Sequence, residues 1–218
     1  MVSGMKTVGI IPAAGKGARW GKYPKFLLPC GPGEWLLDRA IRQIPSDKTI
    51  IVFSENTLLD IATHVRRCSL SDKIILIEQT KPWDLYGAIH AALQVEADFY
   101  YMAMPDTYIP KDIFSKMNYP GITFGAFITS EPERFGVLRD TGIVDKMPGP
   151  PGYAWGCISW SKEVRDSWLN RKIGYFPDAL NFAIKHFESH MVKMDFYYDM
   201  ANWNSYKEFA KNEISSEE

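Results

Sequence analysis

Small residues, glycines and cations follow the first apolar run of the chain. Residues 8–11 are apolar, and Pro12-Ala-Ala-Gly15 comes directly after them, followed by Gly17, Arg19 and Lys25. Small residues leave backbone N–H groups exposed and let a ligand approach closely. Arg19 and Lys25 add positive charge beside those amides, so the segment predicts a loop that holds polyphosphate.

Two familiar phosphate-binding patterns are absent from this loop. A dinucleotide-binding GxGxxG needs a third glycine where the chain has Trp20, and no GK[ST] follows to complete a P-loop. The loop by itself therefore leaves open whether it binds phosphate or is a plain surface loop.

The elements that must position this loop alternate between strand and helix in the first half of the chain. Apolar runs predict strands at 8–11, 49–53, 73–77 and 99–103, and helical apolar stripes predict helices at 34–44, 58–65 and 85–93. This βαβαβαβ order predicts a mainly parallel sheet with helices on both faces.

The regular alternation of predicted strands and helices ends after Asp106. We expect strands at 121–128, 153–160 and 191–198, a hairpin over 135–146, and helices at 162–170, 177–188 and 204–212. No internal repeat or low-complexity linker divides the chain, so we expect one domain with an elaborated second half.

Composition narrows the function class. The chain has 218 residues, 25 Lys+Arg and 26 Asp+Glu, and this near-zero net charge argues against a nucleic-acid binder. Three widely spaced cysteines predict no disulfide framework or metal cluster and favour a cytoplasmic location. The chain has no run of 18 apolar residues, so we expect no membrane span.

Several segments, in order along the chain, carry a family resemblance. The positions that match a Gly-x-Gly-x-Arg signature followed by Pro-Lys are Gly15, Gly17, Arg19, Pro24 and Lys25. Later matching segments are 104–106, 131–137, 144–146 and 196–200. Together these segments resemble the sugar-1-phosphate nucleotidyltransferases over nearly the whole chain.

The resemblance implies a three-layer α/β/α Rossmann-like fold with a mixed, mainly parallel central sheet. It implies one catalytic domain over 1–218, with a nucleotide-binding half at about 5–106 and a sugar-phosphate-binding half at about 107–212. The implied reaction joins a nucleoside triphosphate (NTP) and a sugar 1-phosphate to give a nucleotide-diphosphate sugar and pyrophosphate, with Mg²⁺ as cofactor.

The resemblance also assigns roles to four charged residues. Arg19 would hold the β- and γ-phosphates, and Lys25 would bridge the α-phosphate and the incoming sugar phosphate. Asp106 and Asp199 would bind Mg²⁺, a hard cation that suits carboxylates and phosphate oxygens. Nothing in the local sequence shows that these two aspartates meet.

The family likeness places nucleotide binding on a second group of residues, namely Ala13, Ala14, Gly15, Gly17, Gln79 and Pro82. Gln79 could hydrogen-bond a base edge, and the backbone of the loop would do the rest. Asp84 stands where the family often has glycine. The identity of the base therefore stays open.

The positions matched to the sugar phosphate are Gly136, Asp145, Lys146 and Trp155. Asp145 replaces the usual glutamate, and its shorter arm suggests a shifted or different acceptor. Trp155 could stack on a sugar ring or belong to the core. The identity of the sugar therefore also stays open.

The sequence leaves two other functions open. The loop 12–25 matches equally well the cytidylyltransferase of isoprenoid synthesis, which acts on an alcohol phosphate, although the segment 132–137 favours the sugar family. The other alternative is a nucleotide-sugar-binding regulatory protein without turnover, against which the retained Arg19, Lys25, Asp106 and Asp199 argue. The sequence leaves homo-oligomerisation open.

Overall fold

A nine-stranded sheet forms the centre of the protein. The computed structural model describes residues 4–15, 23–67, 71–80, 84–171 and 173–214, the side chain of residue 84 excepted. The strands of this sheet are β1 (Thr7–Pro12), β4 (Lys48–Phe53), β5 (Ile74–Glu78), β6 (Phe99–Ala103), β8 (Ile122–Thr129), β9 (Gly136–Arg139), β10 (Gly142–Asp145), β11 (Gly152–Ser161) and β12 (Ser189–Lys193).

Seven of these strands follow the order β12-β8-β11-β6-β1-β4-β5, and the β9–β10 hairpin pairs with the beginning of β11. Strand β11 is antiparallel to both of its neighbours, β6 and β8, whereas every other pair in the row is parallel. Six strands therefore point one way, which confirms the mixed, mainly parallel sheet.

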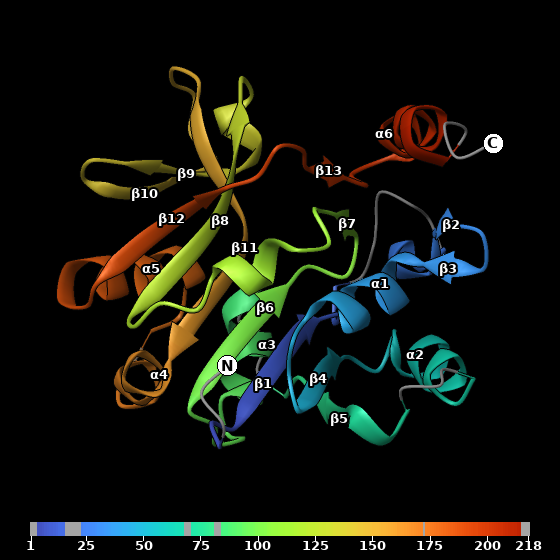
Figure 1. Cartoon of the computed structure of the whole chain (residues 1–218), viewed down its shortest axis with the longest axis horizontal. Coiled ribbons are helices and arrows are strands. Elements are labelled where there is room, and N and C mark those ends of the chain that lie inside the picture. Colours follow the sequence, from blue (N-terminus) through green and yellow to red (C-terminus); the bar gives the residue numbers. More distant parts are fainter. Residues whose placement is uncertain (1–3, 16–22, 68–70, 81–83, 172, 215–218) are drawn as a thin grey trace.

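Helices cover both faces of this sheet (Figure 1). Their bounds are α1 (Leu36–Gln43), α2 (Leu58–Val65), α3 (Asp84–Ala92), α4 (Lys162–Leu169), α5 (Phe176–His186) and α6 (Trp203–Phe209). Residues alternate between the faces of a strand, so Val8 and Ile10 of β1 pack in one core with α3, α4 and α5, while Ile11 packs in a second core with α1 and α2. The three-layer α/β/α architecture is confirmed.

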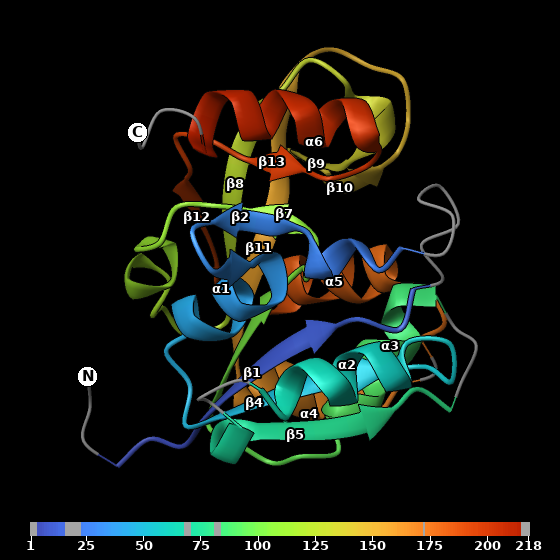
Figure 2. The ribbon, with the colours of Figure 1, turned by 90° about the vertical axis from the view of Figure 1, so that its right-hand side faces the viewer.

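Two short ribbons lie outside the main sheet, and the sequence did not predict either. Strands β2 (Pro29–Gly31) and β3 (Glu34–Trp35) form one, and β7 (Thr107–Tyr108) and β13 (Tyr198–Asp199) form the other. Figure 2 shows α6 and β13 at the upper end, with β7 and β2 below them. A third core holds this end together; its buried members are Leu28, Cys30, Leu36, Tyr108, Met200 and Phe209.

Two predicted boundaries near the C-terminus were wrong. The strand expected at 191–198 is two strands, β12 and β13, because the chain leaves the edge of the main sheet after Lys193 to pair with β7. The helix expected to reach residue 188 ends at His186, since Phe187 is already extended at φ −130° and ψ 164°. Among the described residues, no helix is both long and apolar enough to cross a bilayer.

Candidate active site

The sequence-predicted site residues of the first half follow the carboxyl ends of parallel strands. Ala13, Ala14 and Gly15 follow β1, Gln79 follows β5, and Asp106 follows β6. Because these strands are parallel, their carboxyl ends share one edge of the sheet, which is where open α/β sheets bind ligands. The structure therefore brings the predicted nucleotide-binding segments to a common edge.

The beginning of the glycine-rich loop is anchored to β4. The Ala13 N–H donates to the Val52 carbonyl at 2.8 Å, and the Ser54 hydroxyl donates to the Ala14 carbonyl at 2.9 Å. A Cβ placed on Gly15 would meet no atom of the described residues within 4 Å. The rest of the loop, with Gly17 and Arg19, lies outside the described residues.

The segment that we expect to contact the base is described in part. Gln79 is half-buried, and its backbone N–H donates to the Phe53 carbonyl at 2.8 Å, which fixes the segment beside β4. Pro82 and the side chain of Asp84 lie outside the described residues, so their predicted contacts stay predictions.

Lys25 and Asp106 form an ion pair across this edge. The Lys25 ammonium contacts Asp106 Oδ2, and the two side chains are 20% and 16% exposed. A pair this sheltered is screened from salt less than a surface pair would be. The loop that follows β1 is thus tied electrostatically to the loop that follows β6.

Asp199 joins Asp106 through the small ribbon. Asp199 lies opposite Thr107 in the β13–β7 pair, and the Met200 N–H donates to the Asp106 carbonyl at 3.1 Å. Burial raises the pKa of Asp199, and the charge of Asp106 raises it further, while Lys25 and Arg134 lower it. The two carboxylates that the sequence could not place together are therefore neighbours.

Two carboxylates at one edge suit a hard divalent cation whose other ligands are phosphate oxygens and water. Within the described ranges no third Asp, Glu, His or Cys side chain joins them to complete a protein-only metal cluster. This donor set fits Mg²⁺, which usually takes one or two carboxylates together with substrate phosphates.

Arg134 and Tyr197 also lie at these carboxylates, and the sequence analysis assigned neither of them a role. Arg134 Nη2 lies 3.4 Å from Asp199 Oδ2, and its Nη1 donates to Glu131 at 2.6 Å. Tyr197 stacks on Phe127 with ring centroids 3.9 Å apart, and burial followed by the charges of both aspartates raises its pKa. The matched segments 131–137 and 196–200 were the signals that contained these residues.

Three of the four predicted sugar-phosphate residues converge on one spot. A Cβ on Gly136 would overlap Trp155 Nε1 and would come within 3.3 Å of Asp145 Oδ1. Trp155 Nε1 is buried and has no hydrogen-bond partner among the described residues. Asp145 accepts a hydrogen bond from the Tyr175 hydroxyl, a residue that sequence reasoning missed. We call Gly136, Asp145, Trp155 and Tyr175 the acceptor cluster.

The fourth predicted residue, Lys146, directly follows β10. Its backbone N–H donates to the Phe135 carbonyl at 3.0 Å, and its φ of 51° is left-handed. A non-glycine residue in this region costs about 1–2 kcal/mol, a strain that functional sites often retain. Its exposed side chain begins next to Asp145.

A β-bulge connects the acceptor cluster to the carboxylates. The pairing of β11 with β8 shifts register between Trp155 and Cys157, and a Cβ on the intervening Gly156 would lie 2.5 Å from the Tyr197 ring. Bulges next to active sites redirect side chains, and here Gly156 leaves room for the ring of Tyr197, two residues before Asp199 in the chain. The two groups of site residues are therefore adjacent.

No family model and no curated protein sequence matches the chain. Solved structures do match. A Bacillus anthracis protein assigned as a glucose-1-phosphate thymidylyltransferase, in complex with a sucrose, superimposes with a TM-score of 0.81 at 19% identity, over 94% of each chain.

Two further solved structures also superimpose on nearly the whole chain. The UDP-glucose pyrophosphorylase from Acinetobacter baumannii gives a TM-score of 0.75 at 15% identity, over 94% of this chain and 92% of that one. HddC from Yersinia pseudotuberculosis gives 0.71 at 20% identity, over 95% and 99%. The chain has the nucleotidyltransferase fold.

Proposed function

We propose that the chain transfers a nucleotidyl group from an NTP to a sugar 1-phosphate and releases pyrophosphate. The observation that carries this proposal is the meeting of Asp106 and Asp199 beside Lys25, next to the acceptor cluster. Carboxylates that can hold Mg²⁺, together with a lysine, suit a transfer between two anionic substrates. The adjoining indole N–H and carboxylate suit the hydroxyl groups of a sugar.

In this mechanism the sugar phosphate oxygen attacks the α-phosphorus in line, and pyrophosphate leaves on the opposite side. No covalent enzyme intermediate is needed, so the residues act by positioning and by neutralising charge. Lys25 turns from Asp106 to the α-phosphate and the acceptor phosphate, which reduces their mutual repulsion. Arg19 is assigned the β- and γ-phosphates by the sequence match alone.

Asp106 and Asp199 would hold Mg²⁺, which would supply positive charge at the phosphate oxygens. Arg134 holds Asp199 in place at 3.4 Å and offsets part of the repulsion between the two carboxylates. Tyr197 is buried close enough to both aspartates for their charges to raise its pKa.

The acceptor cluster suits a hydroxyl-rich ligand. Trp155 Nε1 needs an acceptor, and Asp145 needs donors beyond Tyr175. A sugar hydroxyl can meet both needs at once, because it donates and accepts. The compared proteins act on different nucleotides by name, and one of them is UTP-bound while HddC is complexed with GMP-PN, so the base remains to be measured.

An activity panel tests this function. The purified protein is incubated with Mg²⁺, each of five NTPs (ATP, GTP, CTP, UTP and dTTP), and a set of sugar 1-phosphates, and pyrophosphate release is measured. Methylerythritol phosphate is added to the panel. We expect release only when an NTP and a sugar 1-phosphate are both present.

Release with CTP and methylerythritol phosphate alone would favour the isoprenoid-type cytidylyltransferase. If no pair of substrates released pyrophosphate and the protein still bound a nucleotide sugar, the regulatory binder would be favoured. Both results would contradict the proposal. The buried free thiols of Cys30 and Cys157 fit the reducing cytoplasm that we propose as its location.

A further inference from the structure

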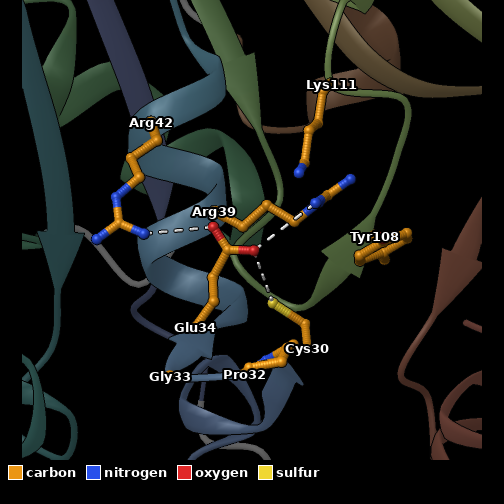
Figure 3. Close-up of a pocket in the computed structure, with 9 residues that line it drawn as sticks. Cys30, Pro32, Gly33, Glu34, Arg39, Arg42, Tyr108 and Lys111 are labelled. Carbon is orange, nitrogen blue, oxygen red and sulfur yellow. Dashed lines mark hydrogen bonds and ion pairs between the residues drawn. The ribbon is translucent and has the colours of Figure 1, made fainter. Parts of the chain in front are cut away.

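A second pocket lies between the β2–β3 ribbon, α1 and the segment after β7 (Figure 3). Its volume is about 280 Å³. The side chains that matter for its chemistry are Cys30, Glu34, Arg39, Arg42, Tyr108 and Lys111. None of them belongs to the predicted nucleotide, metal or sugar-phosphate residues, so this pocket is separate from the proposed active site.

The pocket is positively charged. Arg39, Arg42 and Lys111 line it against the single carboxylate of Glu34, among the residues that the structure describes there. Figure 3 shows Arg39 and Arg42 on either side of that carboxylate, with Lys111 reaching toward Arg39 from the opposite wall. Three cations around one carboxylate leave an excess of positive charge.

Arg39 is the most unusual member because it is only 4% exposed. Its Nη2 donates to the Ile109 carbonyl at 3.1 Å, and its guanidinium lies 3.7 Å from the centre of the Tyr108 ring. Its Nε has no hydrogen-bond partner among the described residues. A buried guanidinium is costly unless its charge and its N–H groups are satisfied, so this site is built for an additional acceptor.

Glu34 satisfies the arginines only in part. Its Oε2 lies 3.7 Å from Arg39 Nη1, beyond hydrogen-bond distance, and its Oε1 lies 3.3 Å from Arg42 Nη1. The Cys30 thiol donates weakly to the same carboxylate at 3.8 Å. One carboxylate is thus shared by two guanidinium groups and makes a good bidentate contact with neither.

We propose that this pocket binds a small phosphate-class oxyanion among Arg39, Arg42 and Lys111, with Glu34 as the internal carboxylate that the oxyanion displaces. A tetrahedral oxyanion has enough oxygens to contact both guanidinium groups and the ammonium together. The same chemistry serves free phosphate, pyrophosphate and the phosphates of a nucleotide.

One wall of this pocket belongs to the same ribbon as Asp199. Tyr108, on which Arg39 stacks, lies opposite Tyr198 in the β7–β13 pair, and the next pair along is Thr107 with Asp199. An oxyanion that draws Arg39 toward it therefore acts on the ribbon that carries Asp199. The binding itself does not depend on the proposed function.

Calorimetric titration of the full chain tests this proposal, with inorganic phosphate, pyrophosphate and a nucleoside diphosphate as separate probes. Lys111→Ala and Arg42→Ala should each weaken phosphate binding by about tenfold or more, since a charge-assisted hydrogen bond is lost. Glu34→Gln should strengthen it, because the competing charge is removed. Among the probes whose binding Lys111→Ala and Arg42→Ala weaken but Lys25→Ala does not, the tightest identifies the source of the oxyanion.

Two control variants keep the result interpretable. Lys116→Ala removes an exposed lysine close in sequence to Lys111 that pairs with Asp112, and Lys25→Ala removes the lysine of the proposed active site. Both should leave phosphate binding in the pocket unchanged.

Three results would overturn the proposal. One is that no probe binds the wild type with a dissociation constant of about 1 mM or lower. Another is equal phosphate affinity in wild type, Lys111→Ala and Arg42→Ala. The third is loss of binding in Lys25→Ala, which would assign the oxyanion to the active site. Should Glu34→Gln fail to fold, the two alanine variants still decide.

Discussion

Lys25 and Asp106 form an ion pair with each other, although we assign them to different partners in the reaction. The lysine ammonium contacts the carboxylate directly, and both side chains are mostly buried. Substrate and metal must therefore exchange this ion pair for two new ones. The exchange costs little, because each charge passes from one opposite charge to another without being left unpaired.

Replacing Lys25 tests this exchange. We expect Lys25→Ala to lower kcat by about 10²–10³-fold, the usual loss for one donor that stabilises developing charge. Nucleotide affinity should change less, since other groups also hold the triphosphate. Steady-state kinetics and nucleotide titration measure the two effects. Lys48→Ala, at the opposite edge of the sheet where Lys48 contacts the Asp72 carbonyl, is the matched control.

Gly136 is predicted to be essential for the acceptor cluster. In Gly136→Ala the new methyl group would overlap Trp155 Nε1 and displace the indole. We expect KM for the sugar phosphate to rise by about tenfold or more, corresponding to the loss of one well-made hydrogen bond and some packing. KM for the NTP should stay within about twofold.

Gly149→Ala is the control for this substitution. Its added Cβ would lie 3.7 Å from Arg139 Nη2, which is ordinary van der Waals contact. Equal KM values for the sugar phosphate in Gly136→Ala and wild type would contradict the assignment of the cluster.

The Tyr175 hydroxyl is predicted to orient Asp145. Tyr175→Phe removes the hydroxyl that donates to Asp145 Oδ2 while keeping the ring. We expect KM for the sugar phosphate to rise by about two- to tenfold, as for loss of one hydrogen bond, with a changed preference among sugars. Kinetics across the sugar panel measure this. An unchanged preference would show that Tyr175 does not act through Asp145.

Asp38 and His64 are predicted to make stability depend on pH. Asp38 Oδ1 lies 2.7 Å from His64 Nε2, which joins α1 to α2. Burial would raise the pKa of Asp38, but the hydrogen bond and charge of His64, with help from Arg42, hold it below its usual range. A lowered folded pKa means that this pair stabilises the protein above about pH 4 and that the stabilisation is lost as the pH falls through the folded pKa.

Urea unfolding of wild type and Asp38→Asn measures this contribution. At neutral pH we expect Asp38→Asn to be less stable by about 1.5–3 kcal/mol, the range for hydrogen bonds to charged groups. The difference should shrink once the pH falls below the folded pKa of Asp38. A difference that is constant from neutral to acidic pH would contradict the role of the carboxylate charge.

Much of the main sheet could be predicted because its signals are local. The apolar runs that form β1, β4, β5 and β6 are short, and the helices between them show a regular apolar stripe, so strand and helix periodicity identify them. The small ribbons could not be predicted, because β7 and β13 are two residues each and pair across a long separation in the sequence.

The candidate site likewise has residues that the sequence could name and contacts that it could not predict. Asp106 and Gly136 lie in segments that match a known signature, so the sequence could name them. The meeting of Asp106 with Asp199, and the approach of Tyr175 to Asp145, are tertiary contacts between distant segments. The second pocket contains no recognisable motif, because its arginines come from one helix and its lysine from another segment.

Loss of the carboxylate charges tests the central claim most directly. Mg²⁺-dependent pyrophosphate release is measured for wild type, Asp106→Asn and Asp199→Asn, and circular dichroism checks that each variant folds. Asp112→Asn, which removes an exposed carboxylate paired with Lys116, is the control. We predict that both site variants lose turnover by about 10²-fold or more, since the charge that holds the metal is gone. Near wild-type turnover in a folded Asp106→Asn or Asp199→Asn would contradict the account.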